Sequence, residues 1–401
     1  MTSKKRLLFV MSSMDNGGAE RALLNLIEEL PAEEFDIDLL LLNPTGLFLN
    51  QIPAKVNLLH TPDVVQDCFT SIRGRRVSAW RLAADVVSSL ISRDEETRRG
   101  FRWKHFYTHV IDEVPGHYDT AISFINGQVL YFVDEKVAAD RKIVFYHGDY
   151  RSAHYSSKYE EPHLQRMDGI YAISPECLAI FQSVFPEVQE KTGYLPNIVS
   201  PKVIRSRAKE FYPPEYKSDE AVILTVARVT HEKGVDIAIE AGAELKRRGL
   251  KFTWYELGKG VAGDSELNRC RKLVDDLDVA DVFHLLGPKE NPYPYIMNAD
   301  IVVQPSRFEG KSVVLDESKI LAKPIVATAY PTVVDQVSEN EGIVVDIDPI
   351  ALANGIESLL KDEQRVVEIT DHLRSSDYGN TCYIEDFKAA FSSGAVTVPA
   401  E

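Results

Sequence analysis

The feature that most constrains the fold of this chain is a pattern that runs once and then starts again. Short apolar runs such as residues 6–12 (RLLFVMS) alternate with amphipathic stretches such as residues 20–30 (ERALLNLIEEL). This alternation is typical of parallel strands joined by crossover helices. After a stretch rich in proline and charge at 194–220, a second series begins with the apolar run 221–229. Because 401 residues are also too many for one ordinary core, the sequence predicts two successive α/β units.

The boundary between the two series is predicted near residues 197–219. Strands of the first unit are predicted at 6–12, 36–42, 119–125, 142–148 and 169–174, and strands of the second at 221–229, 251–258, 282–287, 300–306, 323–328 and 342–347. The last helix, at 380–393, follows after the second sheet is complete. We therefore expect domains at 1–198 and 199–380, with a separate C-terminal segment at 381–401.

Composition and charge exclude several classes of protein. The net charge of -16 has the wrong sign for a general nucleic-acid binder, which needs a basic face to neutralise phosphates. The four cysteines form no C-x-x-C pair, so they indicate neither a zinc site nor a disulfide framework, and a reducing cytoplasm fits them best. No apolar run reaches the roughly 18–20 residues that span a bilayer, and the N-terminal segment is too polar for a signal peptide. We expect a cytoplasmic protein that is soluble or at most peripheral to a membrane.

Several glycines and charges lie at the carboxyl ends of strands, where doubly wound sheets bind their ligands. Gly17 and Gly18 lie between the first strand and the first helix. Glycines there let the backbone approach a ligand, and free N–H groups attract phosphate, although such pairs are often plain turns. Arg228 and Lys233 follow the first strand of the second unit. They can neutralise a diphosphate without a metal, or they are two solvated charges.

A G-x-G-x-x-G pattern at Gly258, Gly260 and Gly263 looks like a dinucleotide fingerprint. It does not follow the first strand of its unit, and the next strand ends without the acidic residue that would bind a ribose hydroxyl. We therefore interpret it as a loop that lines a nucleotide pocket.

The metal-binding pattern D-x-D occurs three times, at Asp36/Asp38, Asp276/Asp278 and Asp346/Asp348. Two of these pairs flank apolar strand runs and one lies in a helical stretch, whereas metal ligation requires a loop. We expect no catalytic metal.

Two glutamates flank the loop after the apolar run 300–306. Glu309 opens this loop, and Glu317 lies in the next predicted helix, about two turns further on. That separation suits two contacts along a nucleotide-sugar, with exposed N–H groups of the loop between them. On spacing alone, two surface acids are the alternative in so acidic a chain.

These stretches and their order resemble the retaining glycosyltransferases of family 4, which have the GT-B fold. The resemblance covers nearly the whole chain and rests on NGGAER at 16–21, ARVTHEKG at 227–234 and the stretch 291–328. Its most specific part is the E-x7-E element followed by Lys-Pro-Ile-Val-Ala-Thr. The implied fold class is α/β, with two Rossmann-like, doubly wound domains facing a central cleft. The C-terminal helix is implied to cross back to the first domain.

The resemblance also implies roles for individual residues. The first domain would bind the acceptor and the second a nucleoside-diphosphate sugar. Glu309 would contact hydroxyls of the donor sugar and Glu317 the ribose, while Arg228 and Lys233 would hold the diphosphate. Gly17 and Gly18 would approach the phosphates from the first domain. The other expected donor-binding residues are Gly258, Gly310, Lys311, Ser312 and Val313.

Two positions depart from the family's pattern. Lys311 and Ser312 stand where the family commonly has an aromatic or aliphatic residue and then Gly or Pro, which makes the sugar pocket more polar. The usual Pro-Asn-Gly turn between the domains is Pro196-Asn197-Ile198 here. The sugar and the flexibility between the domains therefore stay open.

His147 ends the predicted strand 142–148 and should face the cleft. In related enzymes a histidine in this region lies near the acceptor and the donor sugar. Its ring or backbone would stabilise the transition state, or its ring would help to receive the acceptor proton. A histidine satisfied in the wall between the domains is the alternative. Asp149 is a weaker companion, with a plain turn as its alternative.

Residues 71–105 are basic within this acidic protein, with nine arginines and lysines against four acids. Arginines interleaved with Trp80, Phe101 and Trp103 suit an anionic membrane surface or a lipid-diphosphate acceptor. A solvated pair of helices is the alternative.

The sequence therefore predicts a retaining, metal-independent hexosyltransferase. It would move a sugar from a nucleoside diphosphate, with UDP favoured by family frequency alone, to a hydroxyl of a lipid-linked glycan, a protein or another acceptor. The expected role is cell-surface polysaccharide or glycoconjugate synthesis, in the cytoplasm or at the inner face of the membrane. No cofactor beyond the nucleotide-sugar is expected. A synthase of soluble glycosides and an inactive GT-B partner or chaperone of another transferase are the alternatives.

Overall fold

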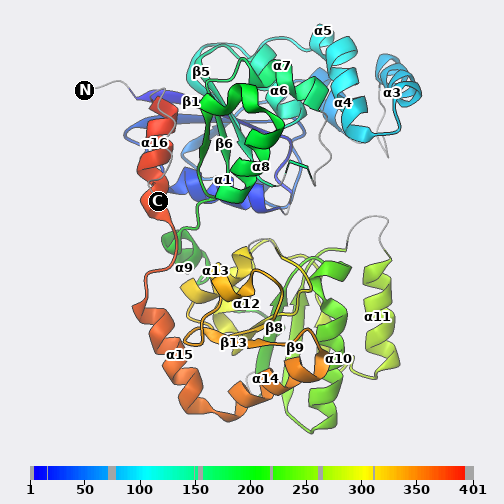
Figure 1. Ribbon diagram of the computed structural model, residues 1–401, viewed down its shortest axis with the longest axis vertical. Coiled ribbons are helices and arrows are strands. Elements are labelled where there is room, and N and C mark those ends of the chain that lie inside the picture. Colours follow the sequence, from blue (N-terminus) through cyan, green and yellow to red (C-terminus); the bar gives the residue numbers. More distant parts are fainter. Residues whose placement is uncertain are drawn as a thin grey trace. The chain divides into compact units, whose positions relative to one another are not determined.

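The chain folds into two compact units (Figure 1). The computed structural model describes residues 4–15, 17–70, 78–148, 150–151, 157–216, 220–260, 265–309 and 312–392. The first unit combines Met1–Ile198 with Asn380–Glu401, and the second is Val199–Gly379. The division after Ile198 lies at the start of the region where the sequence pattern changes.

The first unit is built on a seven-stranded parallel sheet with the order β3-β2-β1-β4-β5-β6-β7. Its strands are β1 Lys5–Met11, β2 Phe35–Leu41, β3 Val56–Leu58, β4 Tyr118–Ser123, β5 Ala139–Tyr146, β6 Gly169–Ala172 and β7 Thr192–Tyr194. All the strands predicted for this unit are present. The edge strands β3 and β7 were not predicted, because neither stands in an apolar run long enough to show a period.

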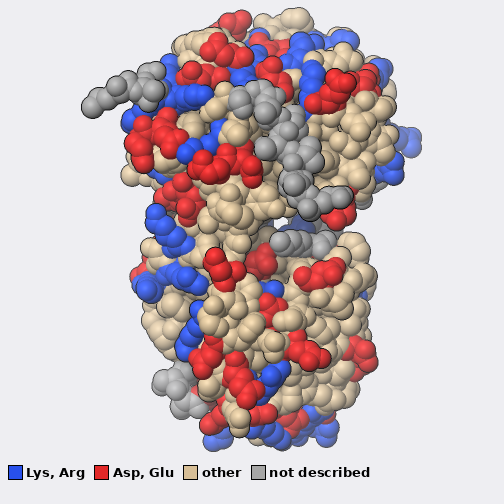
Figure 2. Space-filling model, turned by 60° about the vertical axis from the view of Figure 1, so that its left-hand side comes forward, with Lys and Arg blue, Asp and Glu red and all other residues tan. Residues whose placement is uncertain are grey.

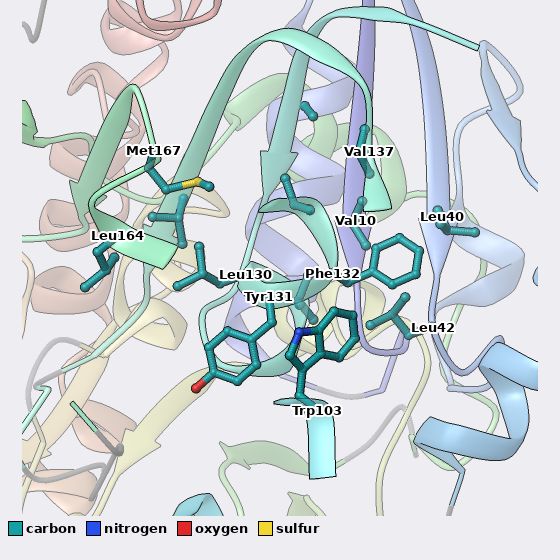
Figure 3. Packing of buried hydrophobic residues seen from close by; sticks show 14 of the residues in the cluster. Val10, Leu40, Leu42, Trp103, Leu130, Tyr131, Phe132, Val137, Leu164 and Met167 are labelled. Atoms are coloured by element: carbon teal, nitrogen blue, oxygen red, sulfur yellow. The ribbon is translucent and has the colours of Figure 1, made fainter. Parts of the chain in front are cut away.

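Helices cover both faces of this sheet, as a doubly wound fold requires. They are α1 Gly18–Glu29, α2 Asp63–Phe69, α3 Ala79–Ile91, α4 Glu95–Arg102, α5 Thr108–Val110, α6 Gln128–Lys136, α7 Ser157–Leu164, α8 Pro175–Val184 and α16 Ile384–Ser392. Alternate residues of the strands feed two apolar clusters, with Leu8 and Val10 in one and Leu7 and Phe9 in the other. Figure 3 shows part of the first cluster, in which Trp103 packs beside Tyr131 and Phe132.

The last helix, α16, belongs to the first unit. The ring of Phe391 lies 5.8 Å from that of Phe9 of β1, and Phe387 stacks on Phe145 of β5 at 5.7 Å. Thr120 Oγ1 of β4 donates a 2.7 Å hydrogen bond to the carbonyl oxygen of Phe391. The expected return of the C-terminal helix to the first domain is therefore confirmed.

The second unit has a six-stranded parallel sheet with the order β10-β9-β8-β11-β12-β13. The strands are β8 Ala221–Val226, β9 Phe252–Leu257, β10 Phe283–Leu285, β11 Ile301–Gln304, β12 Ile325–Thr328 and β13 Gly342–Val345, each of them predicted. The helices are α9 Pro201–Arg207, α10 Val235–Arg247, α11 Glu266–Asp276, α12 Tyr293–Asn298, α13 Val313–Ile320, α14 Pro349–Lys361 and α15 Glu363–Ser375. The chain leaves β8 toward β9 and returns on its other side as β11, so the ends of β8 and β11 form a topological switch point.

Charged residues of both signs lie on the surface of each unit (Figure 2). Figure 2 shows acidic and basic side chains interspersed on one face. Among the described residues, no helix combines the length and the apolar character needed to cross a bilayer.

Candidate functional site

The switch point of the second unit holds an ion pair. Lys233 ends the short 3-10 helix His231–Lys233 after β8, and Glu309 lies in the loop after β11. Lys233 Nζ is 2.5 Å from Glu309 Oε2, and the two side chains are 21% and 7% exposed. The sequence predicted both residues for the site but not their pairing, because they are 76 positions apart.

Glu309 is held by residues that the sequence reasoning missed. Its Oε1 accepts hydrogen bonds from Gln304 Nε2 at 2.8 Å and from Ser306 Oγ at 2.9 Å. Gln304 ends β11, and its Oε1 accepts from Ser312 Oγ at 3.1 Å. A carboxylate has about four acceptor positions, so Oε1 is saturated, whereas Oε2 binds Lys233 and keeps one position that no described residue fills. The sequence signal that could have indicated them is the run of polar residues at the end of a buried strand, Gln304-Pro-Ser306.

The loop between the two glutamates is only partly described. Gly310 and Lys311 lie outside the described residues. The N–H of Ser312 donates to Gln336 Oε1 at 2.7 Å, so the expectation that this N–H is exposed for a ligand is wrong. Val313 starts α13, and the side chain of the N-cap residue Ser312 does not cap this end, so among the described residues the first N–H groups of the helix are available to an anion.

Two other predicted residues flank this region. Glu317 lies in α13, as predicted, and is only 1% exposed, so it is not the surface acid of the alternative interpretation. Arg228 follows β8 and is exposed. The pKa of Glu232 is lowered mainly by hydrogen bonds from the backbone and from Thr230, and the charge of Arg228 lowers it further. That the glutamates and cations bind a donor is a prediction.

The two glycines of the turn after β1 have different surroundings. Gly17 has extended backbone angles and precedes α1. A Cβ on Gly17 would lie 2.2 Å from Glu20 Oε2, whereas a Cβ on Gly18 would meet nothing within 4 Å. A side chain at Gly17 would require the flexible Glu20 side chain to move, whereas Gly18 has open space around it. Burial raises the pKa of Glu20 to about 7 at this helix end.

His147 follows β5 in the first unit. Its Nε2–H donates to the carbonyl oxygen of Phe124 at 2.7 Å, and its ring lies 4.9 Å from that of Phe124. Burial lowers the pKa of His147 to about 4, so the ring is neutral near pH 7 with Nδ1 unprotonated. A base this weak is a poor acceptor of the substrate proton, which favours the ring's role as a polar contact. Asp149 lies outside the described residues.

A cavity of about 1180 Å³ in the first unit reaches His147. Helices α3 and α4 supply arginines and carboxylates to its wall, namely Arg81, Asp85, Glu95, Glu96, Arg98, Arg99 and Arg102. Arg102 binds Glu95 at 2.8 Å and Ser88 Oγ at 3.2 Å, and Arg81 binds Asp85. Neither Arg81 nor Arg102 is solvated, since both are 7% exposed, so the expectation of a solvated helical pair is wrong for them.

Helix α3 has its faces reversed relative to an ordinary surface helix. Arg81 and Ser88 are buried, while Val86 is 60%, Leu90 81% and Ile91 56% exposed. Trp103, which the sequence reasoning offered to a membrane, is 1% exposed in the core. Arg73, Arg75 and Arg76 lie outside the described residues.

The glycine-rich loop after β9 lines a second, smaller cavity of about 280 Å³ in the second unit. A Cβ on Gly258 would lie 1.6 Å from the carbonyl oxygen of Ala227, so the close approach of β8 and β9 requires this glycine. Glu256 of β9 also lines the cavity and was not predicted as a site residue. Gly263 lies outside the described residues.

The D-x-D pairs have structural partners. Asp38 of β2 accepts from Tyr118 Oη at 2.8 Å, and Asp276 of α11 pairs with Lys272. Asp348 caps α14 by accepting from the N–H groups of Ile350 and Ala351.

Comparison with known proteins finds a family match within the second unit. Residues 206–375 match the family described as glycosyl transferases group 1. Amylovoran biosynthesis glycosyltransferase AmsK of Erwinia amylovora is 31% identical over 157 residues, which cover 37% of this chain and 38% of the relative. The N-acetylgalactosamine-N,N'-diacetylbacillosaminyl-diphospho-undecaprenol 4-alpha-N-acetylgalactosaminyltransferase of Campylobacter jejuni is 30% identical over 145 residues, 35% of this chain and 38% of the relative. In these alignments the chain spans well under half the length of each relative.

A solved structure matches over both units. HepE of Anabaena, in complex with UDP-glucose, has a TM-score of 0.65 at 17% identity and covers 96% of this chain and 98% of its own. At this identity the likeness shows the fold alone, which is the GT-B fold that the resemblance implied. The chain therefore has the GT-B fold, and residues 206–375 of its second unit are similar to the glycosyl transferases group 1 family.

Proposed function

We propose that this protein is a retaining, metal-independent glycosyltransferase that moves a sugar from a UDP-sugar to a hydroxyl of a lipid-linked glycan in polysaccharide biosynthesis. The observation that carries the proposal is the Lys233–Glu309 pair, held at the switch point of the second unit by Gln304 and Ser306. Doubly wound sheets bind nucleotides at this point. An inactive partner protein would not require a lysine and a glutamate held together at the nucleotide-binding end of the sheet.

The reaction follows from the charges at this edge of the sheet. The bond between the anomeric carbon and the diphosphate oxygen breaks, and the acceptor oxygen bonds to that carbon. For attack on the same face, the acceptor proton passes to an oxygen of the departing diphosphate, which gives retention without a protein nucleophile. Arg228 and Lys233 stabilise the charge that gathers on the diphosphate, in place of a metal. The remaining acceptor position on Glu309 Oε2 binds a hydroxyl of the sugar.

The choice of UDP rests on a solved structure with the same fold and on the frequency of UDP in the family that the sequence resembles. HepE, with the same fold, was solved with UDP-glucose. Glu317, buried in α13, is proposed to bind the ribose. The sugar itself is not specified by these residues.

The lipid-linked acceptor is supported by the surface of the first unit. Leu82 and Val86 of α3 are 45% and 60% exposed and also line the cavity that reaches His147. Arg98 and Arg99 of α4 line the same cavity. An apolar chain on α3 would place a diphosphate near these arginines and the glycan toward His147. The name of the Campylobacter relative includes a diphospho-undecaprenol acceptor.

Two experiments test the proposal. Thermal unfolding with UDP, GDP and ADP, followed by turnover of UDP-sugars with and without EDTA, should show stabilisation by UDP and turnover that survives the chelator. Failure of UDP to bind, or loss of turnover that Mn²⁺ restores, would contradict the donor or the metal-free mechanism.

The membrane part is tested by flotation with vesicles that contain anionic lipid. The double variant Leu90→Ser/Ile91→Ser should lose flotation, because both side chains are exposed on α3. The control is Val367→Ser, which changes a 57% exposed valine of α15 in the second unit. Equal flotation of both variants, or none for the unmodified protein at low salt, would exclude α3 as a lipid contact.

A further inference from the structure

Glu256 is a buried carboxyl group that has no hydrogen-bonding partner among the described residues. It lies on β9, one residue before the end of the strand, and is 0% exposed. Neither carboxyl oxygen has a hydrogen-bond partner in the described part of the chain. Nearly all buried polar groups are satisfied in folded proteins, and an unsatisfied one destabilises the fold. A carboxyl kept in this condition indicates a missing partner.

The position of Glu256 shows where that partner would lie. The carboxyl is part of the wall of the 280 Å³ cavity, together with Gly258, Gly260, Leu267, Leu285 and Leu286. This cavity lies at the carboxyl ends of β9 and β10. In the sheet, β9 is the direct neighbour of β8, whose end leads to Arg228 and Lys233. A nucleotide whose diphosphate lies at the end of β8 can therefore place its base in this cavity.

We propose that Glu256 reads the nucleobase of the donor, through a pair of hydrogen bonds between its carboxyl group and the edge of the base. The inference rests on the proposed function and deepens it, because it names a residue that selects the nucleotide. The leucines of the cavity wall suit the faces of a flat ring, and the carboxyl is a polar group that can fix its orientation.

The protonation state of Glu256 decides which base it fits. Burial raises the pKa of Glu256 to about 8, so the neutral acid dominates near pH 7. A neutral acid offers one O–H donor beside one acceptor. Uracil offers the complement, an N3–H beside a carbonyl oxygen. The ionised form offers acceptors only and would instead fit two adjacent N–H donors, as on guanine.

Other titratable groups surround this carboxyl. Lys259, which follows β9, and Arg271 of α11 line the same cavity. Cys270 of α11 is buried nearby, and burial raises its pKa to about 12, so its thiol stays neutral. Among these groups, the Glu256 carboxyl is the one expected to change charge between pH 7 and 9. Titration of the nucleotide itself is the other source of pH dependence in this range.

Two variants of Glu256 test this inference. Glu256→Gln keeps one donor and one acceptor in a similar shape, whereas Glu256→Leu keeps neither. Glu240→Gln, at an exposed position of α10, is the control for the change in charge. Affinities for UDP, GDP and ADP are measured by calorimetry at pH 7 and 9, with thermal unfolding of each variant.

From pH 7 to 9 the neutral fraction of the Glu256 carboxyl falls from about 90% to about 10%. The Kd of the unmodified protein for UDP should therefore rise about tenfold more over this range than the Kd of Glu256→Gln. Glu256→Gln should bind UDP within about threefold at pH 7. Glu256→Leu should bind UDP about 10- to 100-fold more weakly. Its melting temperature should rise, because an unsatisfied buried acid is removed.

Two results would overturn the inference. If Glu256→Leu binds UDP as the unmodified protein does, Glu256 is only a buried acid without a ligand. If Glu256→Gln loses binding while the unmodified protein prefers GDP, the neutral acid does not read uracil. The proposed function fails separately, when the unmodified protein binds none of the three nucleotides and turns over no UDP-sugar.

Discussion

Replacing Lys233 with methionine should separate the stability of the second unit from its catalysis. Lys233 Nζ and Glu309 Oε2 are 2.5 Å apart, and the Glu309 side chain is 7% exposed. Lys233→Met leaves the carboxylate with Gln304 and Ser306 but without its cation. Removing one partner of a fully buried pair destabilises by about 3–5 kcal/mol, and the partial exposure of Lys233 reduces the expected loss to about 2 kcal/mol.

The double variant Lys233→Met/Glu309→Gln should recover part of this loss. Two unit charges attract by roughly 4 kcal/mol at 4 Å with an effective dielectric constant of 20, and desolvation offsets most of it. We therefore expect a coupling free energy of about 1–3 kcal/mol between the two positions. For a domain of this size, the loss of about 2 kcal/mol in Lys233→Met lowers the melting temperature by about 4–8 °C.

Catalysis should not recover in the double variant. Lys233 is proposed to act on the departing diphosphate, so each variant without it should lose about 2–4 kcal/mol of transition-state stabilisation, or roughly 30- to 1000-fold in kcat. The assays are calorimetric unfolding and turnover of the donor. The control is Lys272→Met/Asp276→Asn in α11, an exposed pair whose coupling should stay below about 0.5 kcal/mol. Additive losses of stability at 233 and 309, or a double variant that regains turnover, would refute the reasoning.

Three further predictions concern other residues. Gly258→Ala should destabilise the protein by about 2–4 kcal/mol, because its Cβ would lie 1.6 Å from a carbonyl oxygen. Gly18→Ala should instead leave the melting temperature unchanged and raise the donor KM, because a Cβ there meets no atom within 4 Å. Equal melting temperatures for the two variants would contradict this. Burial raises the pKa of Glu160 to about 7, so its contribution to the free energy of unfolding is fully present below pH 4.5 and is lost as the pH rises to about 7. Urea unfolding of Glu160→Gln across this range should show a flatter pH dependence than the unmodified protein, and identical curves would exclude the effect. Burial lowers the pKa of His147 to about 4, so protonation of this ring should not change kcat near pH 6.5. We expect the unmodified protein and His147→Gln to have pH profiles of kcat with the same shape there. A limb near pH 6.5 that is absent in His147→Gln would contradict this.

Most of the fold was predictable because strand and helix periods are local properties of the sequence. The apolar run 300–306 and the helix after it were predicted, and β11 and α13 lie there. The edge strands β3 and β7 were missed because neither stands in a long apolar run, whereas the equally short edge strand β10 was predicted from the apolar run 282–287.

The candidate site was predictable by residue type but not by pairing. Arg228, Lys233, Glu309 and Glu317 were expected at strand ends, yet the contact between Lys233 and Glu309 depends on how β8 and β11 meet. Glu256 was overlooked because an acid in an apolar strand gives no sign of whether it is paired.

The reversed helix α3 was misjudged for a different reason. The basic residues of 71–105 were assumed to face outward, because charged side chains are rarely buried without partners. Here Asp85 and Glu95 supply the partners: Glu95 lies two turns before Arg102 in the same helix, and Asp85 reaches it from α3. Burial of the arginines turned Val86 and Leu90 outward.

The return of α16 to the first unit affects how the protein is synthesised. The core around Phe9 includes Phe387, Ala390 and Phe391, which are synthesised after the whole of the second unit. The second unit is continuous in sequence, so it can finish folding while the first still lacks this helix. At about 5–20 residues per second, the roughly 190 residues between Ile198 and Phe391 take about 10–40 s to translate. During that time the nascent first unit exposes an apolar surface, so it is the part of the chain expected to need a chaperone.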